Sequence, residues 1–558
     1  MSHRISSDGL TNELKHLKLP ASDYDHSHAL EYILTLEEAL RDWKFTIEGH
    51  SVWPIIRLWL WSHLLNPNEP NQGIKECRSG EQTTHHQAQL EKDKFSTRKI
   101  LHLMHLWSKL RLHNKSAEKS LKKAGHRNQR HILVISRREN HQYVSGKEWV
   151  DTNLDPVCDL LEEMNHSVLK VEMASFARLD QKPISQYRTS HFLNWPFQMR
   201  EEAVKSALNR ILFRRVDLRR NEITKMIDAL NQLLPERLQL PYKHLENFRL
   251  MCRVWRRLLK GLDAKAVITN YYYRIHTMAC IQEAKNKTIP TMDIQHGKQG
   301  RIHAMYTHWK QLPEKSYAQL PHYFWVWGQE SANNISSWIS GNCKEKPQTL
   351  VGGNLWLAQC KHNSSHFLLS AEQTSFVNKL QGYERVILLT LQHKLNIVPE
   401  FVYEAMRESP EGWIWLVRMH PVIQKDSSDA IEAFLLERGC QHFEIKHSSN
   451  MPLYALLPHV SHHLTGWSSV CYEAQVFEVP TIFISSRSLK LYENYLNKGI
   501  FHYANNAQKL LNYINKESCD LYRSEDTAYI NCDVDAGRTA INYFLQTNVA
   551  PLQKYKMN

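Results

Sequence analysis

The first candidate for binding an anionic ligand is the loop Arg418-Met419-His420-Pro421. It directly follows the apolar run 413–417, which predicts a buried strand. Proline ends the strand and fixes the loop. Arg418 and His420 then lie at a strand end, where a guanidinium and an imidazole can bind a phosphate or a carboxylate. The alternative is a surface arginine beside a structural histidine.

A second candidate is the loop 465–469, Thr-Gly-Trp-Ser-Ser, which lies between the predicted strand 460–464 and an apolar helix. Hydroxyls and free backbone N–H groups at the start of a helix favour an anion. One helical turn further on, a carboxylate at Glu473 can accept hydrogen bonds from ribose hydroxyls, or simply face solvent. The candidate ligand-binding residues of this loop and the helix after it are Thr465, Gly466, Ser468, Ser469 and Glu473.

The third candidate loop is Gln295-His296-Gly297-Lys298, which follows the predicted strand 288–294. Glycine permits close approach of a ligand to the backbone. The imidazole of His296 titrates near neutrality, so it can act as a general base that deprotonates a hydroxyl. It can equally donate a hydrogen bond to a phosphate. Both roles stay open.

Carboxylates also follow the first predicted strand, 131–136. Glu139 and Asp151 are alternatives to His296 as the base. Asp155 precedes Pro156, a pair typical of the start of a helix, and we interpret it as structural.

Two series of alternating strands and helices hold these loops, one from residue 131 and one from about residue 350. Such alternation predicts parallel α/β sheets, in which ligands bind at the carboxyl ends of the strands. We therefore expect an α/β fold with two doubly wound Rossmann-like domains and a helical N-terminal extension. The expected divisions are a helical region (1–90), a basic amphipathic segment or linker (91–130), a first Rossmann-like domain (131–325), an interdomain crossing (326–355) that holds Gly353 and Asn354, a second Rossmann-like domain (356–545) and a tail (546–558).

The chain of 558 residues carries a net charge of +13, with 42% hydrophobic residues and no apolar run long enough to span a membrane. Its N-terminus lacks the apolar core of a signal peptide, which favours a cytoplasmic protein. The ten cysteines form no CxxC pair, so we expect neither a zinc site nor disulfides. No nucleic-acid-binding signature accompanies the positive charge, so nucleic acid is not an expected partner.

The most basic stretch, 94–130, holds eleven Lys or Arg and one acid, Glu118. It has apolar residues at helical spacing, and basic residues flank them. One interpretation is an amphipathic helix on an anionic membrane surface; the other is a helix packed on its own protein. The apolar positions are Ile100, Leu103, Met104, Trp107 and Leu110, and the flanking basic positions are Lys99, Lys109 and Arg111.

Taken together, the loops resemble those of bacterial surface-polysaccharide transferases, namely the capsule Kdo transferases, the bacterial sialyltransferases and the teichoic-acid CDP-glycerol transferases. The resemblance is carried by the Arg-x-His-Pro loop, the later Thr-Gly-x-Ser-Ser-x-x-x-Glu-Ala pattern, the Gln-His-Gly loop and the Val-Gly-Gly-Asn junction. It covers about 260–490 well and 131–200 loosely. No Asp-Asp-Gly sequence is present, and Leu355 replaces the usual proline of the junction.

The resemblance implies a GT-B glycosyltransferase that uses no metal or other cofactor. Its donor, a nucleotide-sugar such as a CMP-activated acidic sugar, would lie on the C-terminal domain and its glycan or lipid-linked acceptor on the N-terminal domain. His420, Ser468 and Ser469 would contact the donor phosphate or carboxylate. His296 would face the cleft from the N-terminal domain. Two alternatives remain: a sugar-nucleotide 2-epimerase, which needs several acidic residues in the cleft, and a non-catalytic, membrane-peripheral assembly protein.

Overall fold

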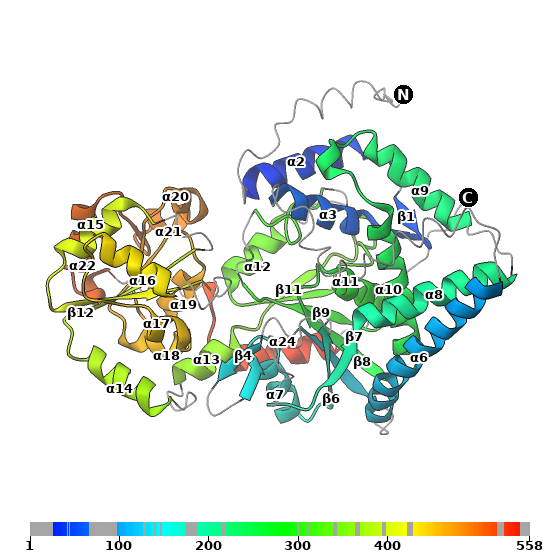
Figure 1. Ribbon diagram of the computed structural model, residues 1–558, viewed down its shortest axis with the longest axis horizontal. Coiled ribbons are helices and arrows are strands. Elements are labelled where there is room, and N and C mark those ends of the chain that lie inside the picture. Colours follow the sequence, from blue (N-terminus) through cyan, green and yellow to red (C-terminus); the bar gives the residue numbers. More distant parts are fainter. Residues whose placement is uncertain are drawn as a thin grey trace.

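Two parallel sheets, each with helices on both faces, form two Rossmann-like domains that lie side by side (Figure 1). This computed structural model describes residues 26–41, 43, 45–65, 97–125, 130–137, 141–144, 148–174, 187–213, 218–297, 299, 302–310, 312–338, 343–362, 369–392, 398–420, 428–521 and 529–546. The expected fold class is confirmed.

The first sheet has seven parallel strands in the order β11-β10-β9-β8-β3-β6-β7. Its central strands are mostly apolar and buried, as expected for a sheet covered on both faces. The order reverses direction between β3 and β8, which makes their carboxyl ends the switch point where ligands bind in such sheets. The bounds are β3 (His131–Ser136), β6 (Val168–Ala174), β7 (His191–Asn194), β8 (Ala264–Asn270), β9 (Thr291–Ile294), β10 (Tyr323–Val326) and β11 (Gln348–Val351).

The hairpin β4 (His141–Val144) and β5 (Glu148–Asp151) follows β3 at the carboxyl edge of this sheet. Helices cover both faces of the sheet and bury two apolar clusters against it. Their bounds are α7 (Asp155–Glu163), α8 (Trp195–Phe213), α9 (Leu218–Asn231), α10 (Tyr242–Lys260), α11 (Ile275–Lys285) and α12 (Gln329–Ser336).

The N-terminal helices α2 (His26–Ala39) and α3 (Trp53–Leu65) are part of the first domain, because their apolar side chains join its larger core. Arg57 on α3 is fully buried and ion-pairs with Glu37 on α2. Its Nε donates to the carbonyl of Ala304 at 2.9 Å and its Nη2 to that of Thr307 at 2.9 Å. The extension therefore holds the 302–309 segment that follows the Gln295–Gly297 loop.

The second sheet has six parallel strands in the order β14-β13-β12-β15-β16-β17. Its switch point lies between β12 and β15, the strand that carries the loop 465–469. The strands are β12 (Arg385–Thr390), β13 (Trp413–Arg418), β14 (Phe443–Glu444), β15 (His462–Thr465), β16 (Thr481–Phe483) and β17 (His502–Tyr503). The helices are α13 (Leu355–His362), α14 (Ala371–Leu380), α15 (Glu400–Glu408), α16 (Ser428–Glu437), α17 (Lys446–Asn450), α18 (Leu453–Leu456), α19 (Val470–Val476), α20 (Arg487–Leu491), α21 (Glu493–Asn497), α22 (Ala507–Ile514) and α23 (Ser518–Leu521).

The domain boundaries differ from the expected ones in two places. Most of the expected crossing 326–355 belongs to the first domain, because it contains α12 and the edge strand β11. The last helix, α24 (Val534–Gln546), returns to the first domain and buries Ile541 and Phe544 against the face that carries Trp325. Figure 1 shows this red helix beneath the first sheet. An apolar helix face indicates burial but not which sheet buries it.

The basic segment forms the long helix α6 (Thr97–Gly125), which packs on α8 and β7. Leu110 of the expected apolar positions is buried there, whereas Met104 is 48% exposed. Arg111 is ion-paired with Glu118 and Glu201. Packing on the protein itself is therefore confirmed for one face of the helix.

Candidate active site

Three strand ends of the first sheet meet around the ring of Tyr271, which directly follows β8. The guanidinium of Arg137, after β3, lies over this ring at 5.5 Å. The imidazole of His296, after β9, stacks on it with 3.3 Å between ring centroids. Tyr271 has a φ of +53°, a strained conformation for a large side chain. At the switch point, an arginine and a histidine thus both contact the ring of one tyrosine.

His296 is neutral at physiological pH because burial, together with the neighbouring His303, lowers its pKa well below the ordinary value. Its Nε2 lies 3.0 Å from the hydroxyl of Tyr273. Its Nδ1 is buried and makes no hydrogen bond to any described residue. A neutral imidazole with one engaged nitrogen can accept a proton or donate an N–H at the other, depending on the tautomer.

The neighbours of His296 in the sequence have structural roles. Gln295 is fully buried, and its amide joins two strand ends by donating to the carbonyl of Gly297 at 2.9 Å and accepting from the N–H of Trp327 at 2.7 Å. Beneath the loop, the carboxyl of Asp293 accepts from the hydroxyl of Tyr306 at 3.1 Å. A Cβ added at Gly297 would meet nothing within 4 Å. Close packing therefore does not require glycine here, and the space beside the backbone is open.

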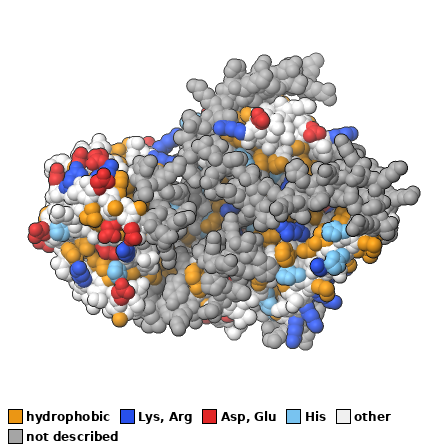
Figure 2. Space-filling view, viewed as in Figure 1, with side chains coloured by type: hydrophobic (Ala, Val, Ile, Leu, Met, Phe, Trp, Pro, Cys, Tyr) orange, Lys and Arg blue, Asp and Glu red, His pale blue; other side chains and the backbone are white. Residues whose placement is uncertain are grey.

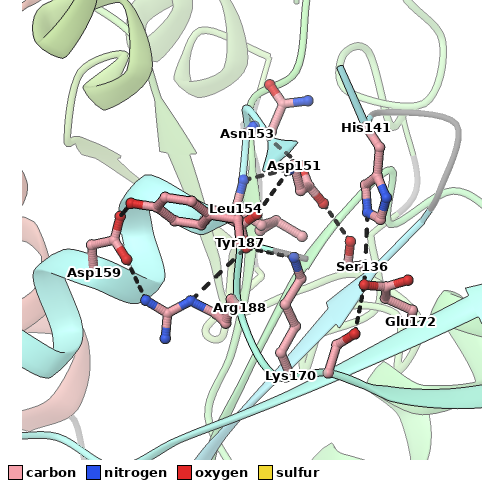
Figure 3. A network of polar contacts seen from close by, with 12 residues as sticks. Ser136, His141, Asp151, Asn153, Leu154, Asp159, Lys170, Glu172, Tyr187 and Arg188 are labelled. Carbon is pink, nitrogen blue, oxygen red and sulfur yellow. Dashed lines mark hydrogen bonds and ion pairs between the residues drawn. The ribbon is translucent and has the colours of Figure 1, made fainter. Parts of the chain in front are cut away.

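Asp151 lies within a closed polar network under the β4–β5 hairpin (Figure 3). Its carboxylate accepts from the hydroxyl of Ser136 and from the backbone N–H groups of Asn153, at 3.1 Å, and Leu154, at 3.2 Å. Because Asp151 is fully buried with these partners, its position fits a turn-stabilising group rather than a base that must reach a substrate. Glu139 and Lys298 lie outside the described residues.

The neighbouring carboxylate, Asp155, begins α7 and is ion-paired with Lys170 on β6, with both side chains fully buried. Asp155 also accepts from the N–H of Asp151 at 2.8 Å. The interpretation of Asp155 as a structural residue therefore agrees with its position.

At the switch point of the second sheet, Thr465 is fully buried and organises the loop 465–469. Its hydroxyl accepts from the amide of Gln392 at 3.1 Å and from the N–H of Ser468 at 3.3 Å. Gly466 lets the chain pass in contact with Gln392, 3.4 Å from the position of an added Cβ. Ser469 precedes α19 without a capping hydrogen bond from its side chain. Ser468 and Ser469 therefore lie between the end of β15 and the start of α19.

Arg418 lies differently from the expected anion-binding arrangement. Its Nη1 donates to the carbonyl of Ser448 and, at 2.8 Å, to that of Met451, so this nitrogen is used to hold α17 and the start of α18. Burial lowers its pKa to about 10, which leaves it charged at neutral pH. His420 follows at the described end of this loop, and Pro421 lies outside the described residues. A strand-end position predicted the place of the guanidinium but not its direction.

Glu473 on α19 carries the clearest ligand-accepting group of the second domain. One carboxylate oxygen lies 3.4 Å from the hydroxyl of Tyr454 on α18, and the other is buried with no hydrogen-bond partner among the described residues. Burial raises the pKa of Glu473 to about 7. Tyr454 is not among the residues predicted from the sequence, because nothing in the sequence near α18 indicates that it lies beside Glu473.

A chain of side-chain contacts joins the loop 465–469 to the His296 region of the other domain. The guanidinium of Arg487 lies over the ring of Trp467 at 4.7 Å and reaches His26 on α2 at 3.4 Å. His26 contacts Trp61 on α3 at 5.3 Å between centroids, and Trp61 contacts His303 at the same distance. His303 in turn lies against Tyr273, the partner of His296, at 5.2 Å. The N-terminal helices therefore connect the loop 465–469 of the second domain with the His296 region of the first.

Gly353 and Asn354 form the crossing between the domains and do not reach this region. Gly353 has a φ of +79° and lies against the carbonyl of Asn531, where a side chain has no room. The N–H of Asn354 donates to the same carbonyl at 2.9 Å, and its side chain caps α13 through Leu357. Both residues therefore hold a close approach between two segments of the backbone.

Within the described part of the chain, no cluster of three or more His, Cys, Asp or Glu residues is placed to hold a metal ion. Among the same residues, no helix is both long and apolar enough to cross a bilayer.

Solved structures with a related fold include two kinds of enzyme. The UDP-GlcNAc 2-epimerase from Methanocaldococcus jannaschii is 14% identical, with a TM-score of 0.46 over 74% of this chain and 99% of that chain. A putative UDP-N-acetylglucosamine 2-epimerase from Listeria monocytogenes is 14% identical, with a TM-score of 0.47 over 75% and 98%. The wall teichoic acid polymerase TagF is 11% identical, with a TM-score of 0.40 over 81% and 97%. At these identities the likeness concerns the fold alone. The sequence matches no protein-family model and no curated protein.

Proposed function

We propose that the protein is a glycosyltransferase that binds a nucleotide-sugar on its second domain and transfers the sugar to a glycan acceptor on its first domain. The observation that carries this proposal is Glu473, a buried carboxylate with one unpartnered oxygen beside the loop 465–469. That loop contacts the first domain through Trp467 and Arg487. A ribose with two hydroxyl donors satisfies such a carboxylate.

On the donor side, the nucleotide lies against the carboxyl ends of β13 and β15. The ribose hydroxyls bind Glu473, and the diphosphate or monophosphate receives hydrogen bonds from Ser468, Ser469 and His420. A CMP-activated acidic sugar as donor rests on the sequence resemblance alone. Charge on the departing phosphate is neutralised by fixed donors, which requires no metal ion or other cofactor.

On the acceptor side, His296 activates the attacking hydroxyl, and Arg137 and Tyr271 hold its ring in place. The described residues directly after β3, β8 and β9 include an arginine, a tyrosine and a histidine. A sugar-nucleotide 2-epimerase is the second candidate, and an activity assay without acceptor distinguishes it from group transfer.

Nucleotide binding should strengthen as the pH rises from 6 to 8, because Glu473 must be ionised to accept charge-assisted hydrogen bonds from ribose. With a pKa of about 7, its ionised fraction rises from roughly a tenth to roughly nine tenths over this range, so the affinity should rise by up to about tenfold. Thermal-shift titrations with CMP, CDP, UDP and GDP at pH 6, 7 and 8 measure this. The ligand-free protein should lose stability as the pH rises from 4.5 to about 7, since over this range its folded state keeps a proton on Glu473 that the unfolded state releases.

The matched variant is Glu473→Gln, which keeps the shape and removes the titration. Its nucleotide affinity should be weak and the same at all three pH values. A panel in which no nucleotide stabilises the protein would contradict both the transferase and an epimerase activity. Conversion of a UDP-sugar to its 2-epimer without any acceptor would contradict transfer specifically.

We also propose that α6 attaches the enzyme to an anionic membrane surface, where a lipid-linked acceptor is found. The outer face of the helix exposes Leu101 and Leu112, at 61% and 68%, and Leu212 of α8 is 53% exposed. Figure 2 shows hydrophobic, basic and histidine side chains together over α6. Glu118, the acid of this helix, points inward. Exposed apolar side chains beside basic ones suit a lipid interface.

The double variant Leu101→Ser/Leu112→Ser should abolish flotation of the protein with phosphatidylglycerol liposomes, because it removes the apolar contact with the acyl chains. The matched control is Leu436→Ser/Leu489→Ser, which changes two exposed leucines of the second domain, at 58% and 43%. Liposome flotation of all three proteins is the measurement. Equal flotation of wild type and the α6 variant would contradict this attachment.

A further inference from the structure

A cavity of about 960 Å³ opens at the amino ends of β3, β6 and β7, the edge of the first sheet opposite to the candidate active site. The last turns of α6 and the outer side of α7 complete its walls. Cavities of this size accommodate a ligand as large as a disaccharide or larger. None of the residues assigned to the transfer reaction lines it.

His131 supplies the first sign that this cavity receives a ligand. It is 7% exposed, and its Nδ1 is engaged by the hydroxyl of Ser167 at 2.7 Å. Its Nε2 is buried and has no hydrogen-bond partner among the described residues. Buried polar nitrogens of this kind are normally paired, so a hydroxyl group from a ligand would complete the site.

Most of the charged groups of the wall are paired with one another. Arg188 binds Asp159, as Figure 3 shows, and Glu162, and Lys170 binds Asp155. Lys123, in the last turn of α6, adds one positive charge. The wall therefore offers mostly paired groups to a ligand. It suits a neutral, hydroxyl-rich molecule that both donates and accepts hydrogen bonds.

Tyr187 supplies the second sign. Its ring lines the cavity and is 41% exposed, while its hydroxyl donates to Asp159 at 2.9 Å. The hydroxyl is therefore occupied, and this contact holds the side chain in place. An aromatic face left exposed in a polar cavity is a platform for the apolar face of a ring.

We propose that this cavity is a second carbohydrate site, which holds sugar rings of the glycan acceptor away from the reacting atoms. Tyr187 stacks on one ring, and His131 binds a hydroxyl of the same or the next ring. The identity of the glycan as acceptor rests on the proposed function, whereas binding of a sugar here does not. A glycan bound at the amino ends of the strands would stay with the enzyme between successive transfers.

Saturation-transfer NMR with the full chain tests the site, with maltotetraose, cellotetraose and chitotetraose as probes. At least one of these should receive saturation from the protein. Tyr187→Ala should weaken its binding by about tenfold or more, the size of a lost aromatic contact. Tyr187→Phe should bind as the wild type does, because the hydroxyl is used internally.

The matched control is Tyr543→Ala on α24, another exposed tyrosine at 52%, which should leave sugar binding unchanged. Nucleotide-induced thermal shifts should be the same in Tyr187→Ala as in the wild type, which also shows that the variant is folded. Saturation of no probe, or equal saturation in Tyr187→Ala, overturns the second site. Sugar binding that depends on Tyr187 in a protein that binds no nucleotide would uphold the site and overturn the proposed function.

Discussion

His296→Ala should lower turnover by roughly 10²–10⁴-fold, the usual contribution of a general base, while nucleotide binding stays within about twofold of wild type. The reason is geometric. His296 lies at the switch point of the first sheet, stacked on Tyr271 and joined to Tyr273, with its Nδ1 unpartnered. Burial keeps the pKa of His296 well below its ordinary value, so the ring is neutral at pH 7 and has a lone pair to take a proton, as a weaker base than a free imidazole. Steady-state kinetics and nucleotide titrations of the same preparation measure both quantities.

His296→Asn separates the two roles left open for this residue. An asparagine side chain still donates a hydrogen bond but does not act as a base. If His296 is the base, both variants lose turnover equally. If it binds the donor phosphate, His296→Asn retains much of the nucleotide affinity that His296→Ala loses, and the assignment as base is wrong.

Tyr273→Phe is the matched variant for ring positioning, because it keeps the aromatic contacts and removes the hydroxyl next to Nε2. Its turnover should fall less than that of His296→Ala. Nucleotide affinity should again be unchanged.

Arg57→Ala should lower the free energy of unfolding of the first domain by about 3–5 kcal/mol, the usual cost of removing one partner of a buried ion pair. The substitution leaves Glu37 charged and buried, and it frees the carbonyls of Ala304 and Thr307. The segment that carries His303 would then lose its support, so turnover should fall as well. Thermal and urea denaturation measure the stability effect.

Arg41→Ala is the control for this change. Arg41, two residues beyond the end of α2, pairs with Glu38 of that helix, but both side chains are largely exposed, and such pairs contribute at most about 1 kcal/mol. If Arg57→Ala changed stability no more than Arg41→Ala does, the N-terminal helices would not be an integral part of the first domain.

Local patterns in the sequence were sufficient for the fold class and for placing the candidate loops at the ends of strands. The apolar runs 413–417 and 131–136 are strands because buried parallel strands need side chains that are apolar on both faces. The loops after these strands lie at strand ends as expected. The same holds for the loops of His296, after β9, and Ser468, after β15.

Tertiary contacts decided what each side chain at these ends does. Arg418 holds backbone carbonyls of α17 and α18, and Asp151 lies in a closed network with Ser136. Neither arrangement is visible in the sequence, because both partners lie far along the chain and the direction of a side chain depends on its neighbours in space.

The same reason accounts for the extension and the last helix. The apolar residues of α2 and α24 are spaced for burial of one face, and α3 is apolar and buried on nearly all sides, but such patterns report burial and not the partner. Only the folded chain brings α24 back to the first sheet and places His26 and Trp61 between the two switch points. The sequence therefore determined the strands, the loops and the chemical groups available, and long-range packing selected which of those groups face a ligand.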